Sequence, residues 1–183
     1  MSIGTEYLQT VIRRVKYYKE LGDKTFEQLN SDTEFHYQPN KESNSIAVII
    51  QHMAGNMLSR WTNFLTEDGE KEWRQRDDEF TEHNYTKTQL LEIWEKGWRC
   101  FLGALESLQE EDLLKCIHIR QEKLSVTDAI NRQLAHYPYH VGQIVYIGRM
   151  VRDSEWKNLS IPKGHSQHYN KGQDIKDPAK KFK

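Results

Sequence analysis

The sequence predicts an all-α protein in which four amphipathic helices form a four-helix bundle. Apolar residues recur at helical spacing in four stretches of the 183-residue chain. Capping residues precede three of these stretches, and polar segments separate them. The chain has the length of one domain with a single hydrophobic core. We therefore place the bundle at residues 1–155, and a C-terminal strap and tail, packed partly on it, at residues 156–183.

The first predicted helix occupies residues 3–29, where apolar positions alternate with basic side chains. A polar connection over residues 30–43 follows it. Apolar spacing then returns and predicts a second helix from Ile46 to about Leu65, with Ser45 among the capping residues before it.

Residues 66–85 form a long acidic segment without apolar periodicity. This is too much chain for a tight turn between antiparallel neighbours, so we expect a crossover that returns the chain to the other end of the bundle. The third helix begins after Thr86, which can form a capping box with Gln89, while Tyr85 and Leu90 can close a hydrophobic staple. Large aromatic side chains on this helix anchor the predicted core.

Residues 116–124 alternate with a period of two around a polar centre, which predicts a short β-hairpin packed on the bundle. The fourth helix begins after the capping residue Ser125. Pro138 removes one backbone hydrogen bond from this helix, so we expect a bend or widening there. Residues 156–169 carry enough apolar side chains to lie against the bundle as an extended strap, and the last dozen residues are expected to be mobile.

Composition excludes several classes of partner. Lys and Arg number 26 against 27 Asp and Glu, so no net field attracts nucleic acid or an anionic membrane. No apolar run approaches membrane-spanning length, and the first residues lack the apolar segment of a signal peptide. Cys100 and Cys116 form neither a CxxC motif nor a disulfide framework. We therefore expect a cytoplasmic protein whose partner is a small molecule.

Three histidines form the central functional prediction. His136 and His140 lie four residues apart in the fourth helix and project the same way. His52 lies beside the apolar stripe of the second helix, which should share the same core. Three imidazoles from two helices can bind one divalent metal ion and leave a coordination position open. The alternative is that His52 is an ordinary hydrogen-bonded residue at the core boundary.

The absence of certain motifs argues against several classes of enzyme. A ferritin-like di-iron site needs Glu-x-x-His motifs, but Gln133 stands three residues before His136 and Ile49 stands three before His52. A zincin peptidase places Glu directly after its first histidine, and here Tyr137 follows His136. No GxSxG, P-loop or dinucleotide-binding motif is present. Peptide hydrolysis therefore lacks its general base.

Further residues are candidates for orienting ligands or substrate. Asn56, Arg60 and Gln143 are placed near the histidines, although ordinary interhelical hydrogen bonding or a solvated charge would explain them at least as well. His165 lies in the strap and could fold over the site as a fourth ligand or proton carrier. The alternative for His165 is an exposed tail.

An early histidine in the second helix with an HxxxH pair in the fourth resembles the DinB/YfiT-like superfamily. The segment HYPYHVGQIVYIGRM, followed by WKNLSIPKGHS, resembles a branch of that superfamily catalogued as a domain of unknown function. The resemblance extends to about Tyr169. It implies up-down-down-up helix order, a divalent ion, often nickel or zinc, on His52, His136 and His140, and a homodimer.

The resemblance also implies an activity. Characterised members include transferases that join thiols such as bacillithiol, mycothiol or glutathione to electrophiles, and mycothiol-dependent isomerases. A bound metal ion lowers the pKa of a thiol and presents a thiolate at neutral pH. We therefore expect a metal-dependent transferase that uses a low-molecular-weight thiol on an electrophilic or toxic small molecule. Two alternatives remain: a metal-dependent hydrolase of small esters or amides, and a non-enzymatic, metal-stabilised stress or interaction protein.

Overall fold

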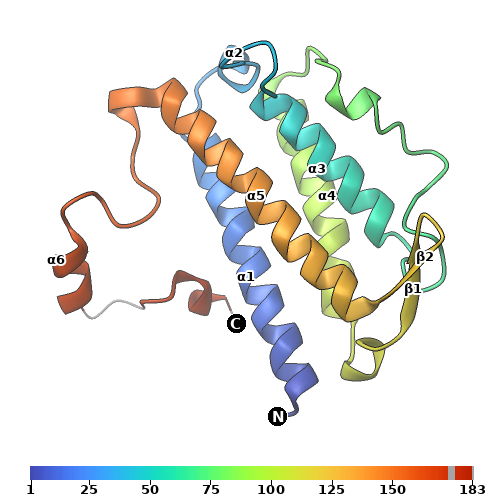
Figure 1. Cartoon of the computed structure of the whole chain (residues 1–183). Helices are drawn as coiled ribbons and strands as arrows, with labels where there is room; N and C mark the ends of the chain where they lie inside the picture. Colours follow the sequence, from blue (N-terminus) through green and yellow to red (C-terminus); the bar gives the residue numbers. More distant parts are fainter. Residues whose placement is uncertain (173–175, 183) are drawn as a thin grey trace.

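The computed structural model describes residues 1–172 and 176–182, and this part of the chain is mostly helical (Figure 1). The long helices are α1 (Ile3–Phe26), α3 (Ile46–Trp61), α4 (Lys87–Ser107) and α5 (Val126–Arg152). The short helices are α2 (Asp32–Phe35) and α6 (Ser166–Lys171), with single 3-10 turns η1 (Asp78–Phe80), η2 (Glu110–Asp112), η3 (Asp153–Glu155) and η4 (Pro178–Lys181). Strands β1 (Cys116–Ile119) and β2 (Glu122–Ser125) form an antiparallel pair. None of the helices in the described part of the chain combines the length and apolar character that a membrane crossing requires.

The long helices begin where their caps predict. The side-chain oxygens of Ser45 and Ser125 accept hydrogen bonds from backbone N–H groups three residues further on, at 3.2 and 3.1 Å. Thr86 and Gln89 form the predicted capping box. Because these hydroxyls satisfy N–H groups that lack helical partners, the starts of α3, α4 and α5 follow from local sequence alone.

Helix ends follow the sequence less closely. The first helix ends at Phe26 rather than residue 29, although Leu29 is still fully buried beyond it. The second predicted helix ends at Trp61 rather than Leu65, because Asn63 adopts the left-handed conformation with φ of 50°. The apolar spacing extends past both helices because Leu29 and Phe64, which follow them, are still buried in the core.

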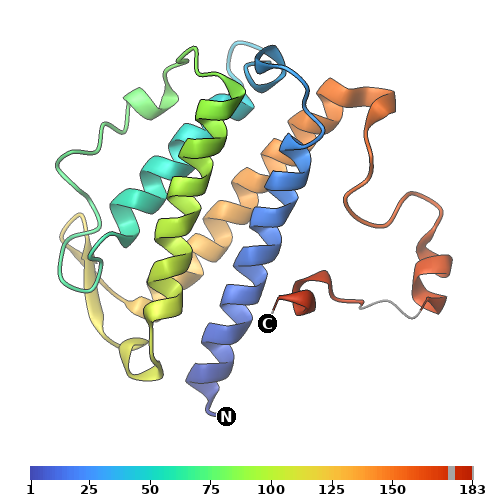
Figure 2. The ribbon, with the colours of Figure 1, turned by 180° about the vertical axis from the view of Figure 1, so that it is seen from behind.

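Helices α1 and α5 run in one direction, and α3 and α4 run in the opposite one (Figure 1 and Figure 2). Helix α3 packs against α4 and α5, and α1 packs against the same two helices. The segment between α3 and α4 runs back along the outside of α3, so that α4 starts at the end where α3 starts (Figure 1). This segment is the predicted crossover over residues 66–85, and its turn η1 contacts α3.

Apolar side chains from all four long helices form one core cluster. Trp94, Trp98 and Tyr137 are almost completely buried, and the rings of Trp98 and Tyr137 meet edge to face at 6.0 Å. Helices α3 and α4 approach closely at Gly97, where an added Cβ would lie 2.8 Å from the Cα of Ala54. Small residues on both helices thus set their separation.

The predicted hairpin is confirmed as β1 and β2. Its turn residues Arg120 and Gln121 have φ of 55° and 66°, a left-handed conformation that residues other than glycine rarely adopt. The backbone N–H groups of both residues donate to the carboxylate of Asp68, each at 2.8 Å. The crossover segment therefore holds the hairpin turn in place.

The C-terminal region differs in part from expectation. Trp156 is half-buried, but the rest of the strap is largely exposed, and α6 stands away from the long helices (Figure 1). The expected mobile tail instead packs against α1 over residues 176–182, where Ala179 is 1% exposed and Asp177 forms an ion pair with Arg14 at 2.6 Å. Residues 173–175 and 183 lie outside the described residues. Helix α5 is continuous across Pro138.

Candidate metal centre

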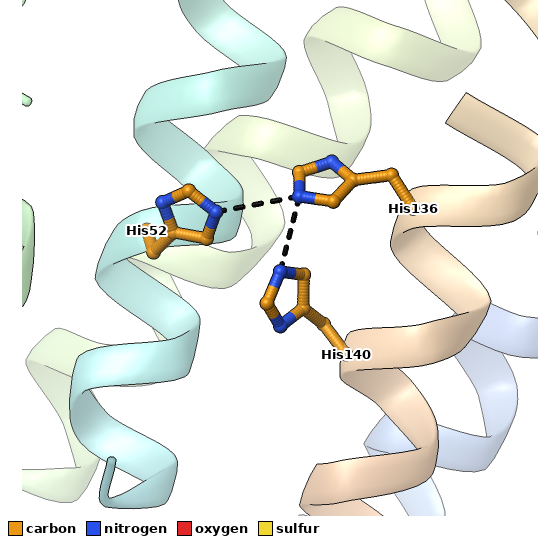
Figure 3. A group of neighbouring side chains, drawn as sticks. All are labelled: His52, His136 and His140. Carbon is orange, nitrogen blue, oxygen red and sulfur yellow. Dashed lines mark hydrogen bonds between the residues drawn. The ribbon is translucent and has the colours of Figure 1, made fainter. Parts of the chain in front are cut away.

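The three predicted histidines meet between α3 and α5. His52 lies in the second turn of α3, and His136 and His140 lie one turn apart on α5. Figure 3 shows the three rings pointing toward one another from the two helices. The Nε2 atom of His136 lies 3.4 Å from Nε2 of His52 and 3.0 Å from Nε2 of His140. The ligand atoms of all three residues lie within 4.8 Å of one another, so the cluster could hold a metal ion.

Burial keeps His136 and His140 of this cluster uncharged. His52 and His140 are 6% and 8% exposed, and His136 is half-buried. Burial, followed by the electrostatic effects of His140 and His52, lowers the pKa of His136 to about 3. Burial also lowers the pKa of His140, although its hydrogen bond to Gln143 opposes this effect. Both rings are therefore neutral at pH 7, the form in which imidazole binds metal ions.

The outer nitrogen of each ring faces a side-chain oxygen. These Nδ1 contacts are His52 to Glu79 Oε2 at 3.1 Å, His136 to Gln133 Oε1 at 3.3 Å, and His140 to Gln143 Oε1 at 2.8 Å. Because carboxylate and amide oxygens only accept hydrogen bonds, a neutral ring in this arrangement carries its proton on Nδ1. Its lone pair is then on Nε2, the atom that faces the other two rings.

Three lone pairs that face one another without a proton between them repel, and a cation among them removes that repulsion. Nitrogen ligands lie about 2.0–2.1 Å from zinc, which places neighbouring ligands of a tetrahedral ion about 3.3 Å apart. The observed Nε2 separations of 3.0 and 3.4 Å bracket this value. The residues present therefore fit a divalent ion.

Glu79, which orients His52, comes from η1 in the crossover. Arg74 donates two hydrogen bonds to its carboxylate, at 2.7 and 2.8 Å. Burial by itself would raise the pKa of Glu79, but Arg74 and His52 outweigh burial and lower it. The carboxylate packs directly over Gly55, where an added Cβ would lie 2.6 Å from Cδ of Glu79. The missing side chain at Gly55 thus lets an ionised carboxylate reach α3.

The histidines line a cavity of about 430 Å³. Five of the lining residues are arginines, namely Arg60, Arg74, Arg76, Arg120 and Arg132. No aspartate or glutamate is among its lining residues in the described part of the chain. A cavity of this size suits a small organic molecule.

The structure brings three of the four other predicted site residues to the cluster. Asn56 lines the cavity and accepts a hydrogen bond from the hydroxyl of Tyr137 at 3.0 Å. Arg60 also lines it, although its guanidinium donates to Glu70 at 2.9 Å. Gln143 holds His140. His165 is exposed at the start of α6 and is not among the residues that line the cavity.

The sequence analysis missed Arg74, Glu79 and Phe80 in the crossover and Arg132 on α5. The ring of Phe80 lies 4.7 Å from that of His52. A histidine ligand usually pairs its outer nitrogen with a carboxylate or carbonyl, and that rule could have directed a search to the crossover. Eight acidic residues lie between positions 66 and 85, however, and nothing in their spacing distinguishes Glu79.

Fold and site together define a mostly helical protein with a buried histidine cluster that could hold a metal ion. The chain belongs to the family described as "Protein of unknown function (DUF1572)", whose family model matches residues 2–165. The match includes all four long helices and the three histidines. Neither a curated protein nor a solved structure matches the chain.

Proposed function

We propose that the chain is a divalent-metal-dependent enzyme that transfers a low-molecular-weight thiol to an electrophilic small molecule. The observation that carries this proposal is the convergence of three Nε2 atoms at the wall of a cavity. His52, His136 and His140 would hold the ion. Three neutral nitrogen ligands favour zinc or nickel over calcium or magnesium.

We also propose that the four long helices form a DinB-like four-helix bundle in up-down-down-up order, and that the protein is a homodimer. The opposite directions of the two helix pairs and the long crossover support the proposed bundle (Figure 1). An experimental structure of the metal-loaded protein tests the bundle, and analytical ultracentrifugation tests the dimer.

The bound ion would supply a Lewis acid that stabilises a thiolate at neutral pH. The thiol itself has to be a substrate, because neither cysteine of the chain lines the cavity. Cys100 lies half-buried beside Met57 and Thr62, and Cys116 is exposed on β1. The contribution of the chain is to bring three imidazoles together and to line the cavity in which the reactants would meet.

Thiol transfer is favoured over hydrolysis because the cavity lining in the described residues contains no free carboxylate to act as a general base. Glu79 is engaged by both Arg74 and His52. A purely structural ion would be closed by four protein ligands, whereas the described cluster contains three.

The test starts from elemental analysis of freshly purified protein, which should contain a single metal ion per chain. His136→Ala should lose the ion, whereas His118→Ala, an exposed histidine on β1, should keep it. A panel of thiols with a chromogenic electrophile should give metal-dependent conjugation. Ester turnover without thiol would instead indicate the hydrolase. Bound metal without any turnover would indicate the non-enzymatic protein.

A further inference from the structure

The arginines around the cavity are only partly neutralised. Glu70 accepts hydrogen bonds from Arg60 at 2.9 Å and from Arg120 at 2.7 Å, and Glu79 pairs with Arg74. The other two arginines, Arg76 and Arg132, have no carboxylate partner among the described residues. Two carboxylates therefore face five guanidinium groups. An ion bound by the histidines would add further positive charge.

Arg76 is held at the rim of the histidine cluster by a stack of rings. Its guanidinium carbon lies 5.5 Å from the centroid of the Phe80 ring. That ring in turn lies 4.7 Å from the ring of His52. A cation over an aromatic face is stabilised by the ring quadrupole, so Phe80 positions Arg76 although Arg76 is exposed.

Arg132 belongs to α5 rather than to the crossover. It lies one turn before His136 on α5, and side chains four residues apart share one face of a helix. Arg132 also lines the same cavity as His52, His136 and His140. The two unpaired arginines thus flank the histidines from separate segments of the chain.

Like charges gathered around one cavity repel, and an anion bound among them removes that repulsion. A guanidinium presents paired N–H groups that match the oxygens of a carboxylate or a phosphate. We propose that the cavity binds a small organic anion, whose carboxylate or phosphate group is held by Arg76 and Arg132 beside the histidine cluster. This inference rests on the proposed function, because it names the substrate class of the same site. The cavity volume of about 430 Å³ and the net charge of −1 fit a small molecule rather than nucleic acid.

Calorimetric titration of the metal-free, full-length chain with inorganic phosphate and with malonate tests the proposal. At least one anion should bind saturably at a single site, and the tighter of the two identifies the preferred group. Arg76→Gln and Arg132→Gln should each weaken binding by about tenfold or more, the loss expected for a hydrogen bond between charged groups. Arg149→Gln removes the same charge from an exposed position on α5 outside the cavity and should change affinity by less than about twofold.

The proposal is overturned if neither anion binds saturably, or if Arg149→Gln weakens binding as much as the cavity variants do. Circular dichroism of each variant should match the parent protein, so that a loss of affinity reports the site rather than the fold. The metal content of the freshly purified chain, measured before the metal is removed, separates this inference from the proposed function. Anion binding by a chain that holds no metal when purified would overturn only the metal-dependent enzyme, and a metal-containing chain that binds neither anion would overturn only the anion site.

Discussion

At the scale of single residues, the orientation of each imidazole decides what the cluster can do. A histidine on a helix can turn either nitrogen inward, and its outer partner makes the choice. Glu79 is the strongest of these partners, because its carboxylate is ionised and held by Arg74. The same carboxylate depends on the absence of a side chain at Gly55. Two substitutions test this arrangement separately.

Glu79→Gln should weaken metal binding by about 10–100-fold, the usual effect of altering the carboxylate behind a histidine ligand. The amide retains the shape of the side chain but loses the charge that favours a proton on Nδ1 of His52. Competition against a chromogenic chelator measures the affinity. Glu72→Gln, at an exposed position of the same crossover, is the matched control. Equal affinities of the two variants would refute the orienting role of Glu79.

Gly55→Ala should also weaken metal binding, because the added methyl displaces the Glu79 carboxylate from His52. Gly142→Ala is the control. It lies on α5 close to His140 in sequence, and an added Cβ there meets nothing within 4 Å. The same chelator competition should find normal affinity in the control and reduced affinity at position 55. Full affinity in Gly55→Ala would show that the carboxylate position is unimportant.

At the scale of elements, the crossover connects the hairpin, the histidine cluster and the loop after α2 through its side chains. It supplies Asp68 to the hairpin turn, Arg74 and Glu79 to the histidines, and Glu82 to the loop after α2. Glu82 accepts a hydrogen bond from Ser45, the cap of α3, at 3.0 Å and also pairs with His36. A segment without apolar periodicity is thus fixed by its charged side chains.

His36 gives this attachment a pH dependence. Burial would lower the pKa of His36, but the hydrogen bonds to Glu82 and to the carbonyl of Tyr85 outweigh burial and raise it. Since the folded pKa exceeds the unfolded value of about 6.5, the protonated ring stabilises the folded state. This contribution is fully present below that pH and is lost as pH rises through the folded pKa.

Urea unfolding at about pH 5.5 and about pH 9 measures this effect. His36→Asn should lower the free energy of unfolding more at the acidic pH than at the alkaline one, relative to the unsubstituted chain. His118→Asn changes an exposed histidine whose side chain forms no hydrogen bond or ion pair within the described residues, so it should show no such difference. A pH-independent loss in His36→Asn would contradict the ion-pair explanation.

At the scale of the whole molecule, an ion held by His52, His136 and His140 would join α3 to α5. Binding to the folded state alone stabilises it by about 4 kcal/mol at a thousandfold excess over Kd. In a chain of this length that corresponds to a rise in Tm on the order of 10 °C. Thermal unfolding with added zinc or nickel, and after chelation, should show this difference. It should disappear in His136→Ala, and an unchanged Tm in the parent chain would count against a metal site.

Several features follow from local sequence because their physical causes are local. Helical spacing of apolar residues and the hydroxyls of Ser45, Thr86 and Ser125 predicted where the long helices begin. Alternation predicted the hairpin. The i, i+4 spacing of His136 and His140 placed both rings on one helix face before any packing was known.

Tertiary structure alone decided which distant groups meet. Helical periodicity gives no information about where the residues of a loop lie in space. Nothing in the sequence therefore indicated that Glu79, among the acidic residues of the crossover, would contact His52, or that His165 would lie outside the cavity. The tail docks on α1 through Asp177 and Ala179, a contact between residues far apart in the chain. The sequence by itself determined the helices and the histidine pair, because these depend on neighbours within a few residues. The five arginines that line the cavity and the contact of Glu79 with His52 depend on how α3, α5 and the crossover pack. Only the tertiary structure determines these contacts.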